Sequence, residues 1–385
     1  MSGPVLYLVS GERSGDAHGA ALMREIVATA PGTTFAGLGG PKMRAESGGA
    51  VTDWVEEAGV VGLVEVLRKY GYFRERFRAA LAAIVSLRPD AVIFIDYPGF
   101  NLRLAKALQR AGSTARRIYY ISPQVWAWNR GRIPKMARIL DLMLCIFPFE
   151  KSLYEESGLP TEFVGHPLIQ ELAAGAPVTG LREPLTLGLF PGSRQREISK
   201  HFGPMLGAAR VLQAKFPGLQ VVASAASERL AGAMRAIAAT TGWEPEAWQL
   251  EVGKSRDLMA RATAGAVASG TATLEAAALG LPHCLVYKVA WPTYLVGRAV
   301  MRVDFLGIIN VLAGSEIVEE LLQRDATAEK IAAALDPLLA SPEIRDSLRN
   351  RLGETVGTLN QGHGGRRAAE AILASIDPST SHPIS

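Results

Sequence analysis

A short stretch in the middle of the chain, LGLFPGSRQREI (187–198), combines residue types that bind anions. The apolar run before Pro191 predicts a strand, and the residues after Arg194 predict the start of a helix. A helix start leaves backbone N–H groups unpaired and carries a partial positive charge, so it attracts phosphate. Gly192 would let a ligand approach the backbone, Ser193 offers a hydroxyl, and Arg194 offers a planar fork of donors. An ordinary serine-capped turn with a solvated arginine explains the stretch about equally well.

Two loops that follow apolar runs carry carboxylates instead. The first is SGERSGDAHGA (10–20), which brings together Glu12, Ser14 and Asp16, although Asp16 could simply cap a helix. The second is IDYPGFN, in which Asp96 ends an apolar run. Partial burial can raise the pKa of such a carboxylate and suit it to act as a general base, while a plain turn aspartate is the alternative.

Three more segments hold candidate ligand contacts. In YYISPQVWAWNRGRIPKMAR (119–138), a group of aromatic residues is followed by a group of basic residues, which fits a sugar platform beside a phosphate site, a membrane-interface patch or core aromatics beside a solvated face. In ASGTATLEAAALGLP (268–282), hydroxyls and N–H groups after a predicted strand could hold phosphate, and Glu275 could accept from a ribose diol. A well-capped buried helix is the alternative there. Asn310 lies in an apolar context and must either cap a backbone segment or meet a ligand.

The elements that must position these residues alternate between strand and helix along the whole chain. Short continuous apolar runs indicate parallel strands that are covered on both faces. The pattern stops in the Gly/Pro-rich segment 172–184 and then restarts, which predicts two doubly wound α/β domains with a ligand cleft between them. We expect an acceptor domain at 1–171, a linker at 172–184, a nucleotide domain at 185–362, a terminal helix at 363–377 that packs on the first domain or on a partner subunit, and a disordered tail at 378–385.

Composition narrows the class of protein further. The chain has 385 residues, of which 48% are hydrophobic and 20% charged, and a net charge of +4, which fits a globular protein without a long basic block for nucleic acid. Its two cysteines, Cys145 and Cys284, lie in apolar runs and are expected to be buried free thiols. We find no leader and no apolar run of spanning length, so we expect a cytoplasmic protein. Membrane contact would be peripheral, through the basic amphipathic helix 65–84 or the segment 291–305.

The order of these motifs carries more information than any one of them. SGERSGD, GLGGPKM, GLVEVL, IDYPGFN, YYISPQVWAW, FPFE, FVGHPL, LFPGSRQREI, SGTATLEAA and NVLAGSEIVEELLQ, taken together, resemble the lipid A disaccharide synthase family. The resemblance covers about residues 5 to 335. It implies a GT-B fold with two facing Rossmann-like domains. It also implies inverting transfer of a sugar from UDP-2,3-diacylglucosamine to 2,3-diacylglucosamine 1-phosphate (lipid X), with release of UDP.

The resemblance also implies roles for individual residues. Asp96 matches the general base and Glu12 a second essential acid. The family's nucleotide side matches Arg194, Ser269, Gly270, Thr271, Glu275 and Asn310. We add Gly192 and Ser193 to the UDP side, because they precede Arg194 in the same turn. We assign the acceptor or lipid side to Ser14, Asp16, Ser122, Trp126 and Trp128. The family usually carries Leu-Pro before the asparagine, whereas this chain reads GIIN, and His18 receives no role.

Cofactors and partners are expected from the same resemblance. We expect no cofactor and no metal, and the predicted cleft carries no Asp-x-Asp motif. The expected partners are the two lipid substrates, the anionic cytoplasmic face of the inner membrane and a possible homodimer that exchanges C-terminal segments. The alternatives are a peptidoglycan glucosaminyltransferase-like or 2-epimerase-like enzyme and a non-catalytic nucleotide-sugar sensor. A nicotinamide-dependent oxidoreductase is disfavoured because the Gly-x-Gly-x-x-Gly pattern is missing.

Overall fold

The computed structural model describes residues 3–58, 70–173, 184–291, 303–362 and 364–377. The chain divides into two compact units. Unit 1 comprises Met1–Gln170 and Asn360–Ser385, and unit 2 comprises Glu171–Leu359. Unit 1 is therefore built from both ends of the chain. Most of the expected linker, the expected C-terminal tail, and the GLVEVL motif lie outside the described residues.

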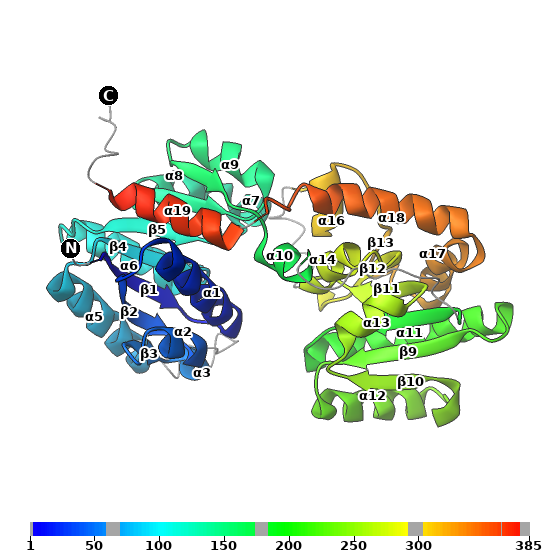
Figure 1. The fold of residues 1–385 in the computed structure, drawn as a ribbon. Coiled ribbons are helices and arrows are strands. Elements are labelled where there is room, and N and C mark those ends of the chain that lie inside the picture. The colour runs from blue at the N-terminus through cyan, green and yellow to red at the C-terminus, as the bar shows by residue number, and fades with distance from the viewer. Residues whose placement is uncertain (1–2, 59–69, 174–183, 292–302, 363, 378–385) are drawn as a thin grey trace. The chain divides into compact units, whose positions relative to one another are not determined.

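Unit 1 holds a parallel sheet of seven strands in the order β3-β2-β1-β4-β5-β6-β7 (Figure 1). Continuous apolar runs form the central strands, because helices cover both faces of the sheet. The strands are β1 (Val5–Ser10), β2 (Thr34–Gly39), β3 (Val51–Asp53), β4 (Ala91–Ile95), β5 (Arg116–Tyr120), β6 (Leu142–Cys145) and β7 (Thr161–Phe163).

The helices of unit 1 pack on two faces according to the alternation of strand side chains. Leu6 and Leu8 of β1 join a core with α1 and α19, whereas Tyr7 and Val9 join the core beneath α5 and α6. The helices are α1 (Arg13–Thr29), α2 (Pro41–Glu46), α3 (Val55–Ala58), α5 (Tyr70–Leu87), α6 (Pro98–Arg110), α7 (Val125–Trp128), α8 (Ile133–Ala137), α9 (Pro148–Glu155), α10 (Pro167–Ala173, which runs into unit 2) and α19 (Gly364–Ile376), with a 3-10 turn at Arg130–Arg132.

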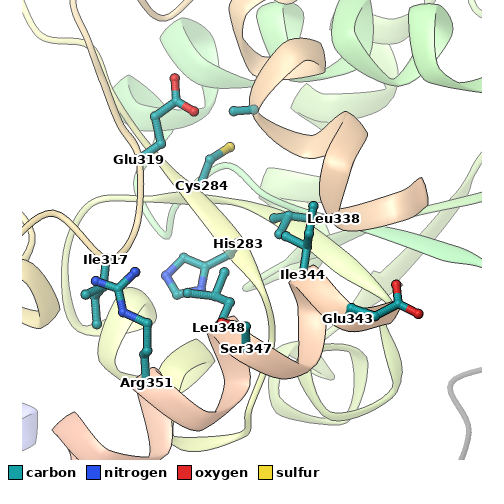
Figure 2. A pocket seen from close by; sticks show the side chains of 11 residues that line it. His283, Cys284, Ile317, Glu319, Leu338, Glu343, Ile344, Ser347, Leu348 and Arg351 are labelled. Atoms are coloured by element: carbon teal, nitrogen blue, oxygen red, sulfur yellow. The ribbon is translucent and has the colours of Figure 1, made fainter. Parts of the chain in front are cut away.

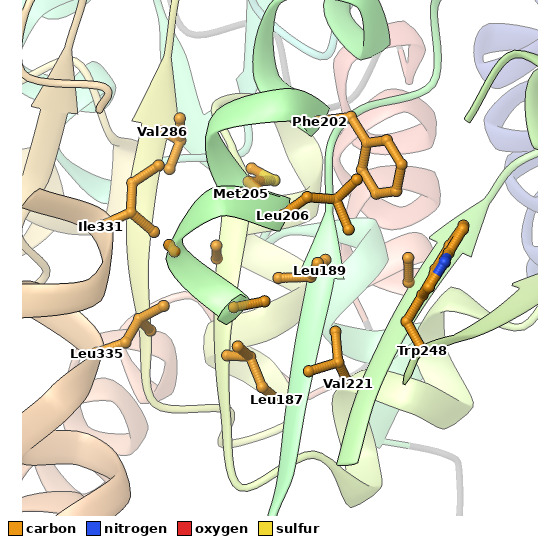
Figure 3. Close-up of a cluster of buried hydrophobic side chains, with 14 of the residues drawn as sticks. Leu187, Leu189, Phe202, Met205, Leu206, Val221, Trp248, Val286, Ile331 and Leu335 are labelled. Carbon is orange, nitrogen blue, oxygen red and sulfur yellow. The ribbon is translucent and has the colours of Figure 1, made fainter. Parts of the chain in front are cut away.

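Unit 2 holds a second parallel sheet, of six strands, in the order β10-β9-β8-β11-β12-β13. Its largest core packs α11 and α17 against one face, where Phe202, Leu206 and Leu335 meet Leu187 and Leu189 (Figure 3). The elements are β8 (Thr186–Phe190), α11 (Gln195–Lys215), β9 (Gln220–Ala225), α12 (Glu228–Thr240), a 3-10 turn (Pro245–Ala247), β10 (Gln249–Val252), α13 (Ser255–Arg261), β11 (Ala264–Ala268), α14 (Thr271–Ala278), β12 (His283–Tyr287), α16 (Ile308–Ala313), β13 (Glu320–Leu322), α17 (Ala328–Ala340) and α18 (Pro342–Gly357).

The two sheets repeat one topology, which confirms the prediction of two Rossmann-like α/β domains. In each sheet the strand order reverses between the first and the fourth strand, between β1 and β4 in unit 1 and between β8 and β11 in unit 2. Ligands of open α/β sheets bind beyond the carboxyl ends of the strands at this reversal. We call the loops after β1 and β4 the unit 1 switch point, and the loops after β8 and β11 the unit 2 switch point.

The basic amphipathic helix of the sequence analysis corresponds to α5, as far as it is described. Its apolar face turns inward: Ala80 and Ile84 are buried, and Phe73 and Phe77 pack edge-on against Trp54 and Phe100. That face therefore covers the sheet of unit 1. Both cysteines are buried free thiols, as predicted. Most of the second membrane candidate, residues 292–302, lies outside the described residues.

Candidate functional site

The unit 1 switch point centres on Asp96, which follows β4 directly. Asp96 and Tyr97 both adopt left-handed backbone conformations, with φ of 46° and 50°. Such conformations are unfavourable for residues with side chains and persist where the surroundings enforce them. Here the Tyr119 hydroxyl and the Asn101 amide both donate to the Asp96 carbonyl at 2.6 Å, and the Asp96 N–H donates to the Tyr120 carbonyl at 3.1 Å. The carboxyl group is thus presented from a backbone that is held on both sides.

The Asp96 carboxyl group is electrostatically suited to accept a proton. Asp96 is half-buried, and this burial raises its pKa above the usual aspartate value, against a smaller lowering by the backbone N–H of Tyr97. A raised pKa makes a carboxylate a stronger base.

Glu12 lies at the end of the neighbouring strand. Ser10 of β1 is in register with Ile95 of β4, so the loops that carry Glu12 and Asp96 leave the sheet side by side. Glu12 is exposed at the N-cap position of α1. The pKa of Tyr97 rises to about 12 through burial and, to a smaller extent, through the charge of Glu12, which places that charge near Tyr97. The structure therefore brings the two predicted acids to one switch point.

Asp16 has a structural role instead. Its carboxylate is 3% exposed and accepts from the backbone N–H groups of Gly40, Lys42 and Met43, at 2.9, 3.1 and 2.9 Å. It therefore caps the start of α2, and these bonds occupy the carboxylate in place of the acceptor-side contact that we expected from the sequence. Ser14, by contrast, is exposed in the first turn of α1.

The predicted aromatic platform divides into a buried and an exposed half. Trp126 is 5% exposed, and its indole N–H donates to Glu150 Oε1 at 2.8 Å. Trp128 is 44% exposed, and the Arg132 guanidinium carbon lies over its ring, 5.0 Å from the ring centroid. Ser122 is buried. Trp126 belongs to the core, so Trp128 is the tryptophan of this pair that a ligand can reach.

Unit 2 presents the sequence motif 191–194 as a tight turn after β8, which we call the phosphate turn. Gly192 has a φ of +115°, a conformation that glycine adopts without strain. Ser193 and Arg194 are exposed, and Arg194 is the N-cap of α11, a helix of 21 residues. Glu197 in the first turn of α11 accepts from the Ser193 and Arg194 N–H groups at 2.8 and 3.1 Å. The local geometry is that of a helix N-terminus whose donors are directed at an anionic group.

A second loop completes the unit 2 switch point. Ser269 follows β11 and donates its N–H to the Val286 carbonyl at 3.1 Å, and α14 begins at Thr271. Gly270 has a φ of +142°, which again favours glycine. Because β8 and β11 pair directly, this loop and the phosphate turn leave neighbouring strands.

Glu275, one turn into α14, is held by an arginine. Arg256 of α13 donates Nε to Glu275 Oε1 at 3.0 Å, while its Nη1 donates to Glu171 at 2.7 Å. The Glu275 side chain is 18% exposed. The carboxylate is therefore oriented and still reachable, as a group that accepts from two hydroxyls must be.

Asn310 belongs to the interior of unit 2. It is 1% exposed, its amide donates to the Val318 carbonyl and to Glu320, and its oxygen accepts from the Ile317 and Val318 N–H groups. Of the two options that the sequence left open, the structure selects the cap. Any contact of Asn310 with a nucleotide would have to replace these bonds.

Known proteins resemble this chain over nearly its whole length. A family model described as Lipid-A-disaccharide synthetase matches residues 6–368, nearly the whole chain. The chain belongs to the lipid-A-disaccharide synthetase family. A protein of Geobacter sulfurreducens named Lipid-A-disaccharide synthase is 40% identical over 378 residues, covering 96% of each chain. One of Myxococcus xanthus with the same name is 37% identical over 382 residues, covering 97% of this chain and 98% of that one.

Solved structures support the fold of this family member. A putative UDP-N-acetylglucosamine 2-epimerase from Listeria monocytogenes aligns over 100% of this chain and 99% of its own, with a TM-score of 0.66 and 12% identity. MurG of Acinetobacter baumannii aligns over 96% and 99%, with a TM-score of 0.60 and 12% identity. At this identity the likeness shows the GT-B-type fold alone, and the family match separates the chain from the epimerase-like and MurG-like alternatives.

Three residues of this family member that received no role from the sequence motifs hold neighbouring motif residues in place. Glu150 is fully buried, and burial is the main cause that raises its pKa to about 7. Arg256 holds Glu275, and His201 links the phosphate turn to the segment that follows β12. His201 Nδ1 donates to the Pro191 carbonyl at 2.9 Å, and Nε2 accepts from the Lys288 N–H at 3.0 Å. Burial lowers the pKa of His201, in keeping with a neutral ring.

The described residues of this lipid-A-disaccharide synthetase family member contain no group of three or more His, Cys, Asp or Glu side chains that could hold a metal ion. Among the described helices, none is long and apolar enough to cross a bilayer. A cavity of about 420 Å³ lies at the other edge of the unit 2 sheet, where β12 begins at His283, and α17 and α18 line it with Leu338, Ile344 and Leu348 (Figure 2). It lies at the amino ends of the strands, away from the unit 2 switch point.

Proposed function

We propose that this chain transfers the diacylglucosamine unit of UDP-2,3-diacylglucosamine to the 6-hydroxyl of 2,3-diacylglucosamine 1-phosphate, with inversion at the anomeric carbon and release of UDP. The observation that carries the proposal is the family match across residues 6–368. Supporting it, the motif residues gather at the two places where the topology favours a ligand. The acceptor is assigned to the unit 1 switch point and UDP to the unit 2 switch point.

Asp96 acts as general base in this proposal. As the acceptor oxygen attacks the anomeric carbon, its O–H bond breaks and the proton passes to the Asp96 carboxylate. The raised pKa of this carboxyl group favours that transfer. Glu12, on the adjacent loop, accepts a hydrogen bond from the acceptor sugar and orients it. Ser14 and Trp128, both exposed, supply the remaining acceptor contacts.

The nucleotide side stabilises the leaving group. Negative charge grows on the β-phosphate of UDP as the bond to the anomeric carbon breaks. Arg194, the Ser193 N–H and the loop of Ser269, Gly270 and Thr271 are donors for that charge, and donors fixed in advance stabilise a transition state at little reorganisation cost. Glu275, oriented by Arg256, accepts from the ribose hydroxyls.

Incubation with both lipid substrates tests the function directly. We expect equal amounts of UDP and of a disaccharide 1-phosphate, and neither product when either substrate is omitted. UDP release without disaccharide would point to hydrolysis, and a 2-epimerised UDP-sugar would support the epimerase-like alternative.

The membrane surface is the proposed site of action, because both substrates carry acyl chains. A hollow of about 510 Å³ between α5 and α6 is lined by Phe77 and three basic side chains, Arg103, Lys106 and Arg110. Such a basic patch attracts anionic headgroups in a salt-dependent way.

Vesicle sedimentation tests this surface. We expect the chain to sediment with vesicles that contain phosphatidylglycerol. About 0.5 M salt should release it, because added salt shortens the Debye length from roughly 10 Å at 0.1 M to roughly 3 Å at 1 M. The double variant K106E/R110E should sediment at most one-third as well, by rough expectation from the loss of attraction per charge. R229E/R235E on the exposed face of α12 makes the same change in net charge and should sediment like the unmodified chain. Equal sedimentation of both variants would remove this surface from the proposal.

A homodimer with exchanged C-terminal segments remains an expectation from the family resemblance. In the structure α19 packs against α1 of the same chain. Analytical ultracentrifugation distinguishes a monomer from a dimer with exchanged segments. A single species at the mass of one chain would contradict the dimer.

A further inference from the structure

The phosphate turn already carries an anion, and this anion belongs to the chain itself. Glu197 Oε2 accepts from the Ser193 N–H at 2.8 Å and from the Arg194 N–H at 3.1 Å. Its other oxygen, Oε1, accepts from Arg194 Nη1 at 3.1 Å. The groups that make this turn attractive to an oxyanion, two backbone amides and a guanidinium, are thus directed at one carboxylate.

The same side chain covers Gly192. A Cβ atom added to Gly192 would collide with Glu197 Cβ and Oε2, so the side chain folds back across the glycine. The open face that a glycine gives to an approaching ligand is therefore occupied. The cover is not deeply buried, since the Glu197 side chain is 28% exposed and the Arg194 side chain 73% exposed. A change of rotamer can move the carboxylate into solvent without disturbing the core.

We infer that Glu197 is a placeholder for the diphosphate of the nucleotide. The inference rests on the proposed function, in which UDP binds at the phosphate turn. The carboxylate and a phosphate oxygen need the same N–H donors, and two anions cannot share them. UDP therefore displaces Glu197 when it binds, and Glu197 returns when UDP leaves. The residue acts through Arg194 and the turn, so it is a positioning residue that weakens UDP binding and speeds product release.

The competing explanation is purely structural. A glutamate three residues after an N-cap residue is the pattern of a capping box, which stabilises a helix start. If Glu197 only supports the turn, its bonds persist in the UDP complex and its loss loosens the site. The two explanations predict opposite changes in affinity for UDP when the charge of Glu197 is removed.

Calorimetric titration with UDP, on the full chain, tests the inference. E197Q keeps the size of the side chain and removes the charge, so we expect the dissociation constant for UDP to fall about tenfold, as when a charged hydrogen-bond partner is replaced by a neutral competitor. Product inhibition by UDP should strengthen by the same factor. E251Q is the matched control, because Glu251 also pairs with an arginine, Arg261, and its side chain is 27% exposed. UDP binding by E251Q should be unchanged.

The outcomes separate this inference from the function on which it rests. Weaker or unchanged UDP binding by E197Q, with normal binding by the unmodified chain, overturns the placeholder role and leaves the proposed function standing. Absence of UDP binding by the unmodified chain overturns both. If E197Q does not fold, E197D serves instead: its shorter side chain cannot reach the amides, and its affinity for UDP should lie between those of the unmodified chain and a tenfold gain. A crystal of the UDP complex in which Glu197 still accepts from Ser193 would also overturn it.

Discussion

At the unit 1 switch point the chain leaves β4 through Asp96 and Tyr97, two left-handed residues that carry side chains, whereas the unit 2 switch point turns on Gly192 and Gly270. The strand order on either side of both reversals is the same. A left-handed residue with a Cβ atom costs roughly 1 kcal/mol. Unit 1 carries that cost twice and offsets it with the hydrogen bonds to the Asp96 carbonyl.

The difference shows what each switch point offers to a ligand. A glycine turn brings backbone N–H groups close to a ligand, which suits an anion that needs many donors. A strained turn with a side chain fixes one functional group in one direction, which suits proton transfer. In the proposed function, the same topology thus serves side-chain chemistry in unit 1 and backbone chemistry in unit 2.

Removal of the Asp96 charge should have the largest effect. We expect D96N to lower kcat by about 10³-fold, because a general base contributes on the order of 10² to 10⁴. The control is D141N, a half-buried aspartate that pairs with Arg117 at the opposite edge of the same sheet. D141N should retain kcat within about twofold. A D96N protein that folds normally and keeps more than a tenth of the activity would contradict the role of side-chain chemistry in unit 1.

Removal of the Arg194 guanidinium comes next. R194A should lower kcat/KM by about 10²-fold, the usual loss when one donor to a developing negative charge is removed. The amides of the phosphate turn remain in this variant, so the effect stays below that of D96N. R196A, two residues along on the same exposed surface, is the control and should behave like the unmodified enzyme. An effect of R194A as large as that of D96N would show that the guanidinium, and not the backbone, dominates unit 2.

The Arg256–Glu275 pair offers a finer test of the nucleotide side. In R256M, Glu275 loses the partner that orients it, and we expect the KM for the UDP-sugar to rise about fivefold with kcat nearly unchanged, as for an interaction of about 1 kcal/mol. R256K should recover part of the loss. R261M, at the end of the same helix, removes an equivalent ion pair with Glu251 and should leave KM unchanged. A fall in kcat without a change in KM would place Glu275 in the chemical step.

The last prediction concerns the stability of unit 1, not its activity. The pKa of Glu150 is raised to about 7 by burial, above its value in the unfolded chain. Between about pH 5 and 7 the folded chain therefore holds a proton that the unfolded chain has lost, and the free energy of unfolding falls as pH rises, by a few kcal/mol in total. In E150Q this fall should be absent. Urea titrations of both proteins at pH 5 and pH 7.5 measure the difference, and parallel pH dependence in the two would contradict it.

Much of the fold was predictable because buried parallel strands form continuous apolar runs, such as AVIFI in β4 and TLGLF in β8. The edge strands β3 and β13 do not show this pattern, because each has three residues and little apolar signal. Loop motifs after predicted strands located both switch points, because strand ends in parallel sheets gather at one edge.

The partners of individual side chains were not predictable. Asp16 accepts a hydrogen bond from Gly40, which lies 24 positions away, and Arg256 donates to Glu275, which lies 19 positions away. No local sequence pattern encodes such pairings. Glu197 is an exception, because its spacing from Arg194 is that of a capping box. The sequence shows that spacing, but only the structure shows that the carboxylate reaches the donors of the turn.

The inclusion of α19 in unit 1 has a consequence for how the protein is made. α19 supplies Ala368 and Ile372 to the core that Leu22, Met23 and Ile26 of α1 enter. A ribosome delivers these two contributions more than three hundred codons apart. Unit 2 can therefore fold on the ribosome before unit 1 is complete. Until α19 has been synthesised, the apolar face of α1 that it covers stays exposed. A premature stop codon near residue 360 should therefore leave unit 2 able to fold and destabilise unit 1, although unit 1 is synthesised first.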